Sequence, residues 1–373
     1  MTAAKLRFGL VGAGFMGRAH ALGLRSVGGV FALPVTPVLE VLADIDPASA
    51  AGAAQALGFA RSTGDWRALV ADPAVDVVDI TAPNALHKPI AMAAIAAGKP
   101  VYCEKPLAPT AEDARDMALA AEAAGVATQV GFNYIKNPLL GLAREMIAGG
   151  ELGDIVGFRG IHAEDYMADP ASPWTWRLDP SGGAGVIADL GSHIINMARF
   201  LLGPIARICA DVETVIGERP LPQGGRRAVE VDDQARMLVR FSRGCGGTIE
   251  ASWLAQGRKM QLEWEVTGSR GTLVFSQERF NELRWFAAGG RPGRDGFRTI
   301  LAGPAHEPYG AFCPAPGHQL GFNDLKVIEI RDFLLALAGD ARPRADFREA
   351  WEVQRVVDAA LRSSRERQWV TVA

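Results

Sequence analysis

Three residues with side chains suited to proton transfer are Lys105, Asp189 and His193. Lys105 follows Glu104 and a short apolar run at 101–103, which predicts a position just after a strand. In an open parallel sheet, ligands bind outside the carboxyl ends of the strands, so Lys105 is expected to face the binding crevice. Asp189 and His193 are four residues apart, and on a helix this spacing places both side chains on one face.

These residue types suit the oxidation of a secondary alcohol with a nicotinamide cofactor. Such a reaction needs a base to remove the hydroxyl proton while hydride leaves the carbon. His193 suits that role near neutral pH, and Lys105 would donate to the same oxygen and stabilise its developing charge. Asp189 would orient either the alcohol or the imidazole.

Structural roles for the same residues stay open at this level. Lys105 could be a solvated loop lysine, and His193 could be satisfied in the core while Asp189 caps a helix. A metal site is a third reading of Asp189 and His193, but the pattern supplies no evident third ligand.

The elements that would position these residues begin with a pattern typical of dinucleotide binding. An apolar run at residues 6–11 leads into a glycine-rich turn and then a helix. The first glycine allows the tight turn, the second lets the backbone approach a pyrophosphate, and the third lets helix pack on strand. The residues of this turn assigned to the cofactor are Gly12, Gly14, Phe15, Met16 and Gly17.

An acid at the end of the second predicted strand indicates the cofactor type. Asp44 follows the apolar run 38–43, where a carboxylate accepts hydrogen bonds from both ribose hydroxyls of NAD. No arginine follows it, and a 2′-phosphate would meet both Asp44 and Asp46, so NADP is disfavoured. Asp46 could alternatively cap the helix that begins at Pro47.

The order of predicted elements indicates an α/β domain followed by an α+β domain. Strands alternate with helices up to residue 132, which predicts a doubly wound parallel sheet in a Rossmann domain at 1–132. After a connecting helix at 133–149, strand follows strand, which predicts a large, mostly antiparallel open-faced sheet in a domain at 133–373. Helices near 324–338 and 346–362 would close this second domain.

Composition excludes several classes of partner. The 373 residues include 39 Lys plus Arg and 42 Asp plus Glu, and a net charge of −3 offers no basic footprint for nucleic acid or an anionic membrane. Apolar runs fall short of the ~20 residues that a bilayer span needs. The four cysteines lie far apart, as expected for reduced thiols, and no signal peptide is evident. We therefore expect a cytoplasmic protein with a small-molecule partner.

Further polar and aromatic residues are assigned to the same crevice. Polar groups between aromatic surfaces suit a polyhydroxylated ring. The residues assigned to the substrate, besides the three above, are Tyr134, His162, Asp165 and Asn196. The further residues assigned to the cofactor are Thr81, Asn133, Trp176 and Arg177.

Three motifs together resemble one family over essentially the whole chain. The glycine-rich turn at 12–17, Glu104-Lys105-Pro106 and Asp189-x-Gly-x-His193 are similar to the glucose-fructose oxidoreductase/inositol dehydrogenase (Gfo/Idh/MocA) family. The resemblance implies that Lys105 and His193 are catalytic with Asp189 as their partner. It also implies homodimers or homotetramers formed through the open face of the second sheet. The residues that it places around the nicotinamide are Pro83, Asn84, His87 and Glu104. Asn196 departs from the family, because many of its sugar and inositol enzymes have aspartate there.

Segments 31–37, 174–177, 296–299, 303–306 and 309–310 resemble the levoglucosan dehydrogenase branch of this family. That branch implies an NAD-dependent dehydrogenase that oxidises a ring hydroxyl of a sugar, anhydrosugar or inositol to a keto sugar. Two alternatives remain open: a redox-neutral NAD-dependent enzyme that cleaves glycosides, and a non-catalytic regulator that senses NAD or sugar. Lys105 and His193 argue against the regulator.

Overall fold

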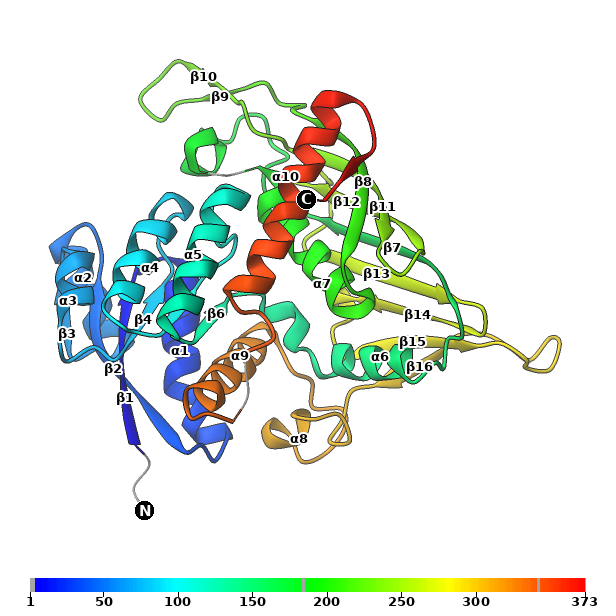
Figure 1. Cartoon of the computed structure of the whole chain (residues 1–373), viewed down its shortest axis with the longest axis horizontal. Helices are drawn as coiled ribbons and strands as arrows, with labels where there is room; N and C mark the ends of the chain where they lie inside the picture. Colours follow the sequence, from blue (N-terminus) through cyan, green and yellow to red (C-terminus); the bar gives the residue numbers. More distant parts are fainter. Residues whose placement is uncertain (1–3, 183–184, 341–342, 373) are drawn as a thin grey trace. The chain divides into compact units, whose positions relative to one another are not determined.

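The computed structural model describes residues 4–182, 185–340 and 343–372, which form two compact units. The first unit contains residues 1–136 and 321–352, and the second contains residues 137–320 and 353–373. Figure 1 gives the element labels used below. None of the helices in these ranges is long and apolar enough to cross a membrane.

The first unit is built on a six-stranded parallel sheet with the order β3-β2-β1-β4-β5-β6. Its chain order reverses between β1 and β4, and such a switch point forms the ligand crevice of doubly wound sheets. The strands are β1 (Ala4–Val11), β2 (Val35–Ala43), β3 (Arg61–Thr63), β4 (Val77–Ile80), β5 (Val101–Cys103) and β6 (Thr128–Val130). The helices are α1 (Phe15–Val30), α2 (Pro47–Leu57), α3 (Trp66–Ala71), α4 (His87–Ala96), α5 (Ala111–Ala124) and α9 (Phe322–Leu337). The expected doubly wound parallel fold is confirmed.

Helix α9 groups with the first unit, whereas the sequence analysis placed it in the second domain. Packing against α1 explains the difference. Gly23 of α1 leaves room for α9, because a Cβ there would lie 2.6 Å from Cδ1 of Ile330. Arg331 stacks over Phe31 at 4.9 Å. These contacts join segments about 300 residues apart, so no local sequence pattern reports them.

The expected single helix over 133–149 is two elements. A 3-10 turn, η2 (Asn133–Lys136), precedes α6 (Pro138–Ala148). The break lies at Asn137, because its side chain caps α6 by accepting from the Leu139 N–H at 2.9 Å. A residue before proline also disfavours helical backbone.

The second unit is built on a nine-stranded sheet with the order β16-β15-β14-β13-β7-β12-β11-β8-β17. All neighbours pair antiparallel except β7 and β12, so the expected mostly antiparallel sheet is confirmed. The strands are β7 (Ile155–Ala163), β8 (Ile205–Glu213), β11 (Gln234–Phe241), β12 (Gly246–Ser252), β13 (Gln261–Gly268), β14 (Gly271–Ser276), β15 (Glu282–Ala287), β16 (Arg298–Leu301) and β17 (Val370–Thr371). Of these, β15, β16 and β17 were not predicted.

The two faces of this sheet differ in their cover. Helix α7 (Ser192–Leu202) packs on one face, where a Cβ at Gly160 of β7 would lie 2.7 Å from Cγ1 of Ile194. On β11, buried residues alternate with exposed ones, and Arg236 and Leu238 point to the other face. That face carries a hollow over β7, β8 and β11–β14, and none of the predicted catalytic residues lines it.

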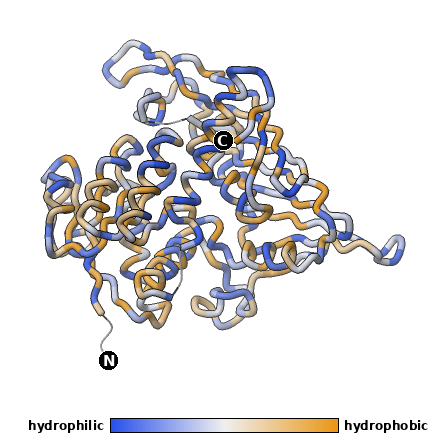
Figure 2. The backbone as a smooth tube through the Cα atoms, in the orientation of Figure 1, coloured by the Kyte–Doolittle hydropathy of each residue, from blue (hydrophilic) through white to orange (hydrophobic). Residues whose placement is uncertain are grey.

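Shorter elements complete the second unit. A separate hairpin pairs β9 (Glu218–Pro220) with β10 (Arg226–Ala228), and it is mostly hydrophilic (Figure 2). The Gly- and Pro-rich stretch at 289–321 contains β16 and the one-turn helix α8 (Tyr309–Phe312). Helix α10 spans Phe347–Glu366, and its residues up to 352 group with the first unit while the rest group with the second.

Candidate active site

The glycine-rich turn between β1 and α1 is open at its second glycine. Gly12 has a φ of 101°, and a Cβ there would lie 2.8 Å from the Thr81 carbonyl oxygen. Gly14 has nothing within 4 Å of its Cβ position. A Cβ at Gly17 would collide with the Gly12 carbonyl. The two outer glycines are thus fixed by packing, while the middle one leaves space for a ligand to approach the backbone.

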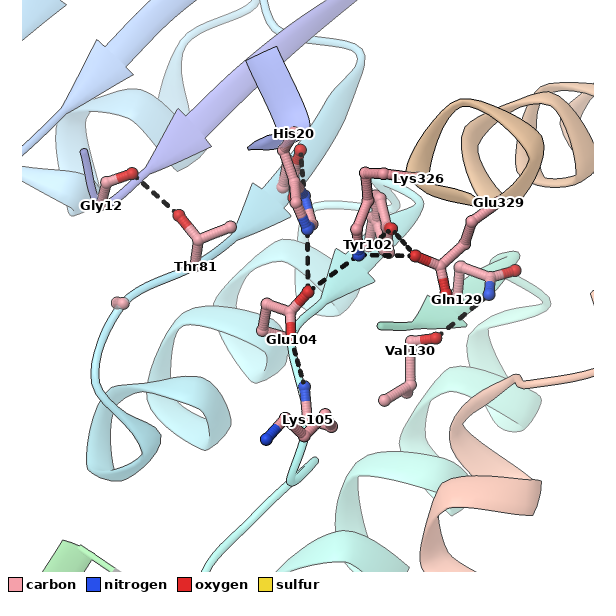
Figure 3. A network of polar contacts seen from close by, with 12 residues as sticks. Gly12, His20, Thr81, Tyr102, Glu104, Lys105, Gln129, Val130, Lys326 and Glu329 are labelled. Carbon is pink, nitrogen blue, oxygen red and sulfur yellow. Dashed lines mark hydrogen bonds and ion pairs between the residues drawn. The ribbon is translucent and has the colours of Figure 1, made fainter. Parts of the chain in front are cut away.

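The start of α1 offers free polar groups to that ligand. No side chain caps this helix and no acid lies in its first turn. Its N–H groups and its dipole therefore suit a pyrophosphate. Thr81, whose assignment to the cofactor remains a prediction, stabilises this turn, because its Oγ1 donates to the Gly12 carbonyl at 2.8 Å (Figure 3). Phe15 is 75% exposed, and its ring lies 5.9 Å from that of Phe322.

Asp44 ties the end of β2 to the glycine-rich turn. Its carboxylate accepts from the Ala13 N–H at 2.9 Å and from the Ile45 N–H at 2.7 Å. This holds a negative charge beside the turn, where NAD would present its ribose hydroxyls. Asp46 caps α2 by accepting from the Ser49 N–H at 2.8 Å, which confirms the alternative role considered for it.

His87 braces two loops of the crevice. It is buried, and its ring nitrogens lie 2.9 Å from the carbonyl oxygens of Pro106 and Ala82. Burial lowers the pKa of His87, although both carbonyls favour the protonated ring. The histidine thus connects the segments that follow β4 and β5. Pro83 and Asn84 lie between, at the start of the 3-10 turn η1 (Asn84–Leu86).

Glu104 and Lys105 lie directly after β5, as predicted, but the Glu104 carboxylate points into the unit. It is buried and accepts from His20 Nε2 at 2.9 Å, from Lys326 Nζ at 3.0 Å and from the Lys105 N–H at 3.1 Å (Figure 3). Burial acts to raise the pKa of Glu104, but the nearby Lys326 and His20 charges hold it well below its usual value. Glu104 is therefore ionised. His20 and Lys326 were not among the predicted site residues.

In the second unit, Asp189 lies on a π-helical turn that precedes α7. The turn spans Ile187–Gly191 and continues directly into the helix that carries His193. The predicted placement on one continuous helical segment is confirmed, with a wider first turn than an α-helix has. Single π turns inside helices occur frequently at functional sites.

Two donors fix the Asp189 carboxylate. Its Oδ2 accepts from Tyr166 Oη at 2.5 Å and from Trp253 Nε1 at 3.1 Å. Burial and the Asp189 charge raise the pKa of Tyr166, so the phenol stays a donor. Both partners were missed from sequence, since they come from separate loops. An aromatic residue with a polar tip is the only local signal that either offered.

His162 lies beside His193, with ring centroids 5.5 Å apart. It is fully buried, its Nδ1 lies 2.9 Å from the Leu190 carbonyl oxygen, and its Nε2 lies 3.3 Å from Glu164 Oε1. Leu190 belongs to the same turn as Asp189, so His162 supports the backbone that carries the predicted acid. Its assignment to the substrate remains a prediction.

The other predicted site residues differ in their surroundings. Asp165 accepts from the Gly257 N–H at 2.9 Å and pairs with Lys259 Nζ at 2.7 Å, which gives it a loop-closing role. Asn196 is buried, and its Oδ1 receives no hydrogen bond from the part of the chain that the structure describes. Trp176 is 42% exposed and stacks under Arg177 at 4.6 Å.

Asn133 and Tyr134 lie in η2 of the first unit. The Tyr134 ring lies 6.2 Å from that of Phe322 on α9. Asn133 is buried, and its Nδ2 donates to no acceptor within the described ranges. Among those same residues, no group of three His, Cys, Asp or Glu is arranged to hold a metal ion.

Asp232 anchors the start of the π turn. Its carboxylate accepts from the Ile187 N–H at 2.8 Å, and its carbonyl accepts from the Val186 N–H at 2.8 Å. Burial raises the pKa of Asp232 to about 6. The residue that orients the Asp189 turn thus titrates near neutral pH, and no sequence motif marked it.

The chain matches two family models. Residues 6–132 match an oxidoreductase family with an NAD-binding Rossmann fold, and residues 141–274 match a GFO/IDH/MocA C-terminal domain. It is 40% identical to a levoglucosan dehydrogenase of Pseudarthrobacter phenanthrenivorans, over 98% of each chain. A solved levoglucosan dehydrogenase in complex with NADH superposes with a TM-score of 0.96 at 39% identity, covering 99% of each chain. An inositol dehydrogenase homologue of Azotobacter vinelandii, solved with NADH and myo-inositol, superposes with a TM-score of 0.84 at 25% identity. The match covers 99% of this chain and 98% of the other.

The raised pKa of Asp232 predicts a pH-dependent stability. Its folded-state pKa of about 6 exceeds the unfolded value of about 3.9, so its contribution is complete below pH 4 and is lost as the pH rises through 6. Asp232→Asn keeps an acceptor for Ile187 but does not ionise. In urea titrations, raising the pH from 4 to 7 should lower the free energy of unfolding of wild type by up to about 3 kcal/mol more than that of the variant. A difference in free energy of unfolding between wild type and Asp232→Asn that stays constant from pH 4 to 7 would contradict this prediction.

The hydrogen bond from Tyr166 to Asp189 predicts a loss of turnover in Tyr166→Phe. A hydrogen bond to a charged group contributes about 1.5 to 3 kcal/mol, so kcat/KM should fall roughly 10- to 100-fold. Tyr309→Phe is the control, because it removes the same hydroxyl group from a tyrosine that donates to the His318 carbonyl at 3.0 Å, among residues outside the site. Steady-state kinetics should show the loss only in Tyr166→Phe; equal effects in both variants would contradict the assignment.

Proposed function

Since this chain belongs to the GFO/IDH/MocA oxidoreductase family, we propose that it oxidises a secondary ring hydroxyl of a sugar, anhydrosugar or inositol to a ketone with NAD. The observation that carries the proposal is the Asp189 carboxylate, held by Tyr166 and Trp253 on the same helical segment as His193. An oriented acid beside a histidine suits proton removal from an alcohol. The similar dehydrogenases named above support the substrate class.

The first unit has the features that NAD requires. The open backbone at Gly14 and the uncapped start of α1 would hold the pyrophosphate, and Asp44 would hold the ribose. Asp44 and Asp46 would repel a 2′-phosphate, which favours NAD over NADP. When bound, NAD takes up the hydride that leaves the carbinol carbon.

The chain's own residues handle the proton. We assign His193 as the base that takes the hydroxyl proton, while Lys105 Nζ donates a hydrogen bond to the same oxygen. Asp189 orients the imidazole or the alcohol. The C–H bond gives its electron pair to the cofactor and the O–H proton goes to His193, so the products are a ketone, NADH and a proton.

Exposed aromatic surface in the second unit suits a ring substrate. Tyr166 and Trp176 are each about two-fifths exposed, and Trp253 contacts Tyr166 edge-on at 6.1 Å. Apolar ring faces with polar edges match sugars and inositols, which present C–H groups on one face and hydroxyls around the rim. Asn196, with its unsatisfied Oδ1, would accept a bond from one such hydroxyl.

We also propose that the chain forms homodimers or homotetramers through the open face of the nine-stranded sheet. Leu238 is 50% exposed there, in the same cross-strand row as Thr248 and the Arg159–Glu265 ion pair. A face that carries both apolar groups and charges of both signs can complement a second copy of itself. A cytoplasmic location fits the four cysteines, which are all unpaired with one another.

The proposed activity predicts NADH formation on a ring substrate. The assay is absorbance of NADH with NAD or NADP across levoglucosan, glucose, methyl glucosides, xylose and inositols. NAD should support turnover on at least one ring, and Lys105→Ala should lower kcat by on the order of 100-fold or more while NAD affinity changes only a few-fold. Sugar cleavage without net NADH would replace the dehydrogenase by the redox-neutral alternative.

The proposed assembly predicts a dimer or tetramer by light scattering coupled to size-exclusion chromatography. Leu238→Glu places a charge in the hollow of the open face and should shift the protein toward monomer. Leu119→Glu is the control, since Leu119 is similarly exposed, at 44%, but lies on α5 of the first unit. A monomeric wild type would remove the proposed interface.

A further inference from the structure

A cluster of buried charged groups surrounds Glu104, the residue before Lys105, in the first unit (Figure 3). We call it the Glu104 cluster. Its members are His20, Asp79, Tyr102, Glu104, Lys326 and Glu329, of which five are 0% exposed and Glu104 is 5% exposed. They come from α1, β4, β5 and its end, and α9. Burying so many ionisable groups is costly unless each is paired, so their contacts are informative.

Lys326 is the cation that joins α9 to the end of β5. Its Nζ lies 3.0 Å from Glu104 Oε1, 2.6 Å from Glu329 Oε2 and 3.1 Å from Tyr102 Oη. The phenol in turn donates to Glu329. All three ammonium protons thus have an acceptor within the cluster.

His20 is the second cation. Its Nδ1 lies 2.8 Å from Asp79 Oδ1 and its Nε2 lies 2.9 Å from Glu104 Oε1. Burial acts to lower the pKa of His20, but the Asp79 charge and the hydrogen bonds to both carboxylates raise it overall. A ring whose two nitrogens both face carboxylates is protonated, so His20 and Lys326 both place positive charge on the same oxygen of Glu104.

The second oxygen of Glu104 reaches the predicted catalytic lysine. Its Oε2 accepts the backbone N–H of Lys105 at 3.1 Å. Gly131, just after β6, leaves room for this carboxylate, because a Cβ there would lie 2.6 Å from Glu104 Cδ. The carboxylate is therefore fixed at one end by two cations and holds the Lys105 peptide at the other.

Stability alone does not account for such a cluster. Replacing a buried ion pair by apolar side chains of similar volume is often neutral or stabilising, so charges retained beside a reactive group point to a role in placing it. An active-site group displaced by about 1 Å costs on the order of 100-fold in rate.

We propose that Lys326 and His20 are positioning residues for the dehydrogenase: through Glu104 they fix the backbone of Lys105, and so the place from which its ammonium meets the reacting oxygen. This inference rests on the proposed function, in which Lys105 contacts the substrate. The series of contacts from α9 to the reacting atoms runs from Lys326 through Glu104 to Lys105.

The test compares Lys326→Met, Glu104→Gln and their double variant with wild-type enzyme. Each single variant should lower kcat roughly 10- to 100-fold with KM for the sugar changed less than about three-fold. Because Lys326 acts through Glu104, the double variant should have the kcat of Glu104→Gln alone, while its melting temperature should exceed that of Lys326→Met, because only one of the two carboxylates paired with Lys326 then stays charged. If kcat recovers together with stability in the double variant, the cluster has only a structural role.

Lys136→Met is the matched control. Lys136 is a buried lysine of the same unit that pairs with Asp332 of α9 at 2.8 Å, and among the described residues neither a hydrogen bond nor an ion pair joins it to Glu104. It should lower the melting temperature while leaving kcat within about two-fold of wild type. A loss of kcat in Lys136→Met as large as in Lys326→Met would overturn the proposal.

A second readout needs no substrate. Competitive acylation followed by mass spectrometry measures the labelling rate of Lys105 relative to other lysines in each folded protein. The rate should change by about three-fold or more in Lys326→Met and Glu104→Gln and stay at the wild-type value in Lys136→Met. An unchanged Lys105 labelling rate in the first two variants would overturn the positioning role, even if the wild type reduced no NAD. A changed labelling rate together with no NADH formation by wild type would support the positioning role and reject the proposed reaction.

Discussion

The buried carboxylate of Glu104 is the constraint on which the arrangement of the first unit depends. An ionised group with so little exposure requires donors and opposite charge, and it receives them from His20 of α1, Lys326 of α9 and the Lys105 backbone. Helix α9 is thereby attached to a sheet whose strands end some 190 residues earlier in the chain. The same interaction that completes this unit also fixes the peptide of the predicted catalytic lysine.

In the second unit, Asp189 is likewise fixed by hydrogen bonds from distant segments. Asp189 lies on a π turn whose start is held by Asp232 and whose middle is supported by His162. Its carboxylate is then oriented by Tyr166 and Trp253. In both units the residue that we assign to the reaction is fixed by hydrogen bonds from segments distant in sequence, so the geometry of the site is a property of the tertiary fold rather than of any motif.

This explains which features were predictable from the sequence. The glycine-rich turn, the alternating strands and helices, and the spacing of Asp189 and His193 are local patterns with a period or a steric reason, and the structure contains them. Strand β15 and the two short edge strands β16 and β17 were missed, because each takes its strand form from pairing with a neighbour. The grouping of α9 with the first unit was missed for the same physical reason, since the contacts of Ile330 and Lys326 are made across the whole chain.

The sequence also did not predict the hydrogen-bond and ion-pair partners of the site residues. Nothing near Lys326 in the sequence distinguishes it from a lysine on the exposed side of a helix, and Tyr166 lies in a loop without a motif. The resemblance placed Glu104 around the nicotinamide, which remains a prediction, but no sequence pattern indicated that its carboxylate contacts His20 and Lys326. Long-range charge pairing decided the direction of that side chain.

The central claim is that hydride passes from a ring carbon to NAD while the chain's residues move only the proton. The most direct measurement is the mass of the NADH formed from a substrate that carries deuterium at the oxidised ring carbon. Direct hydride transfer would give each NADH one deuterium from the substrate, and none from heavy water when unlabelled substrate is oxidised in that solvent. NADH without substrate deuterium, or turnover of the ring without any NADH, would contradict it.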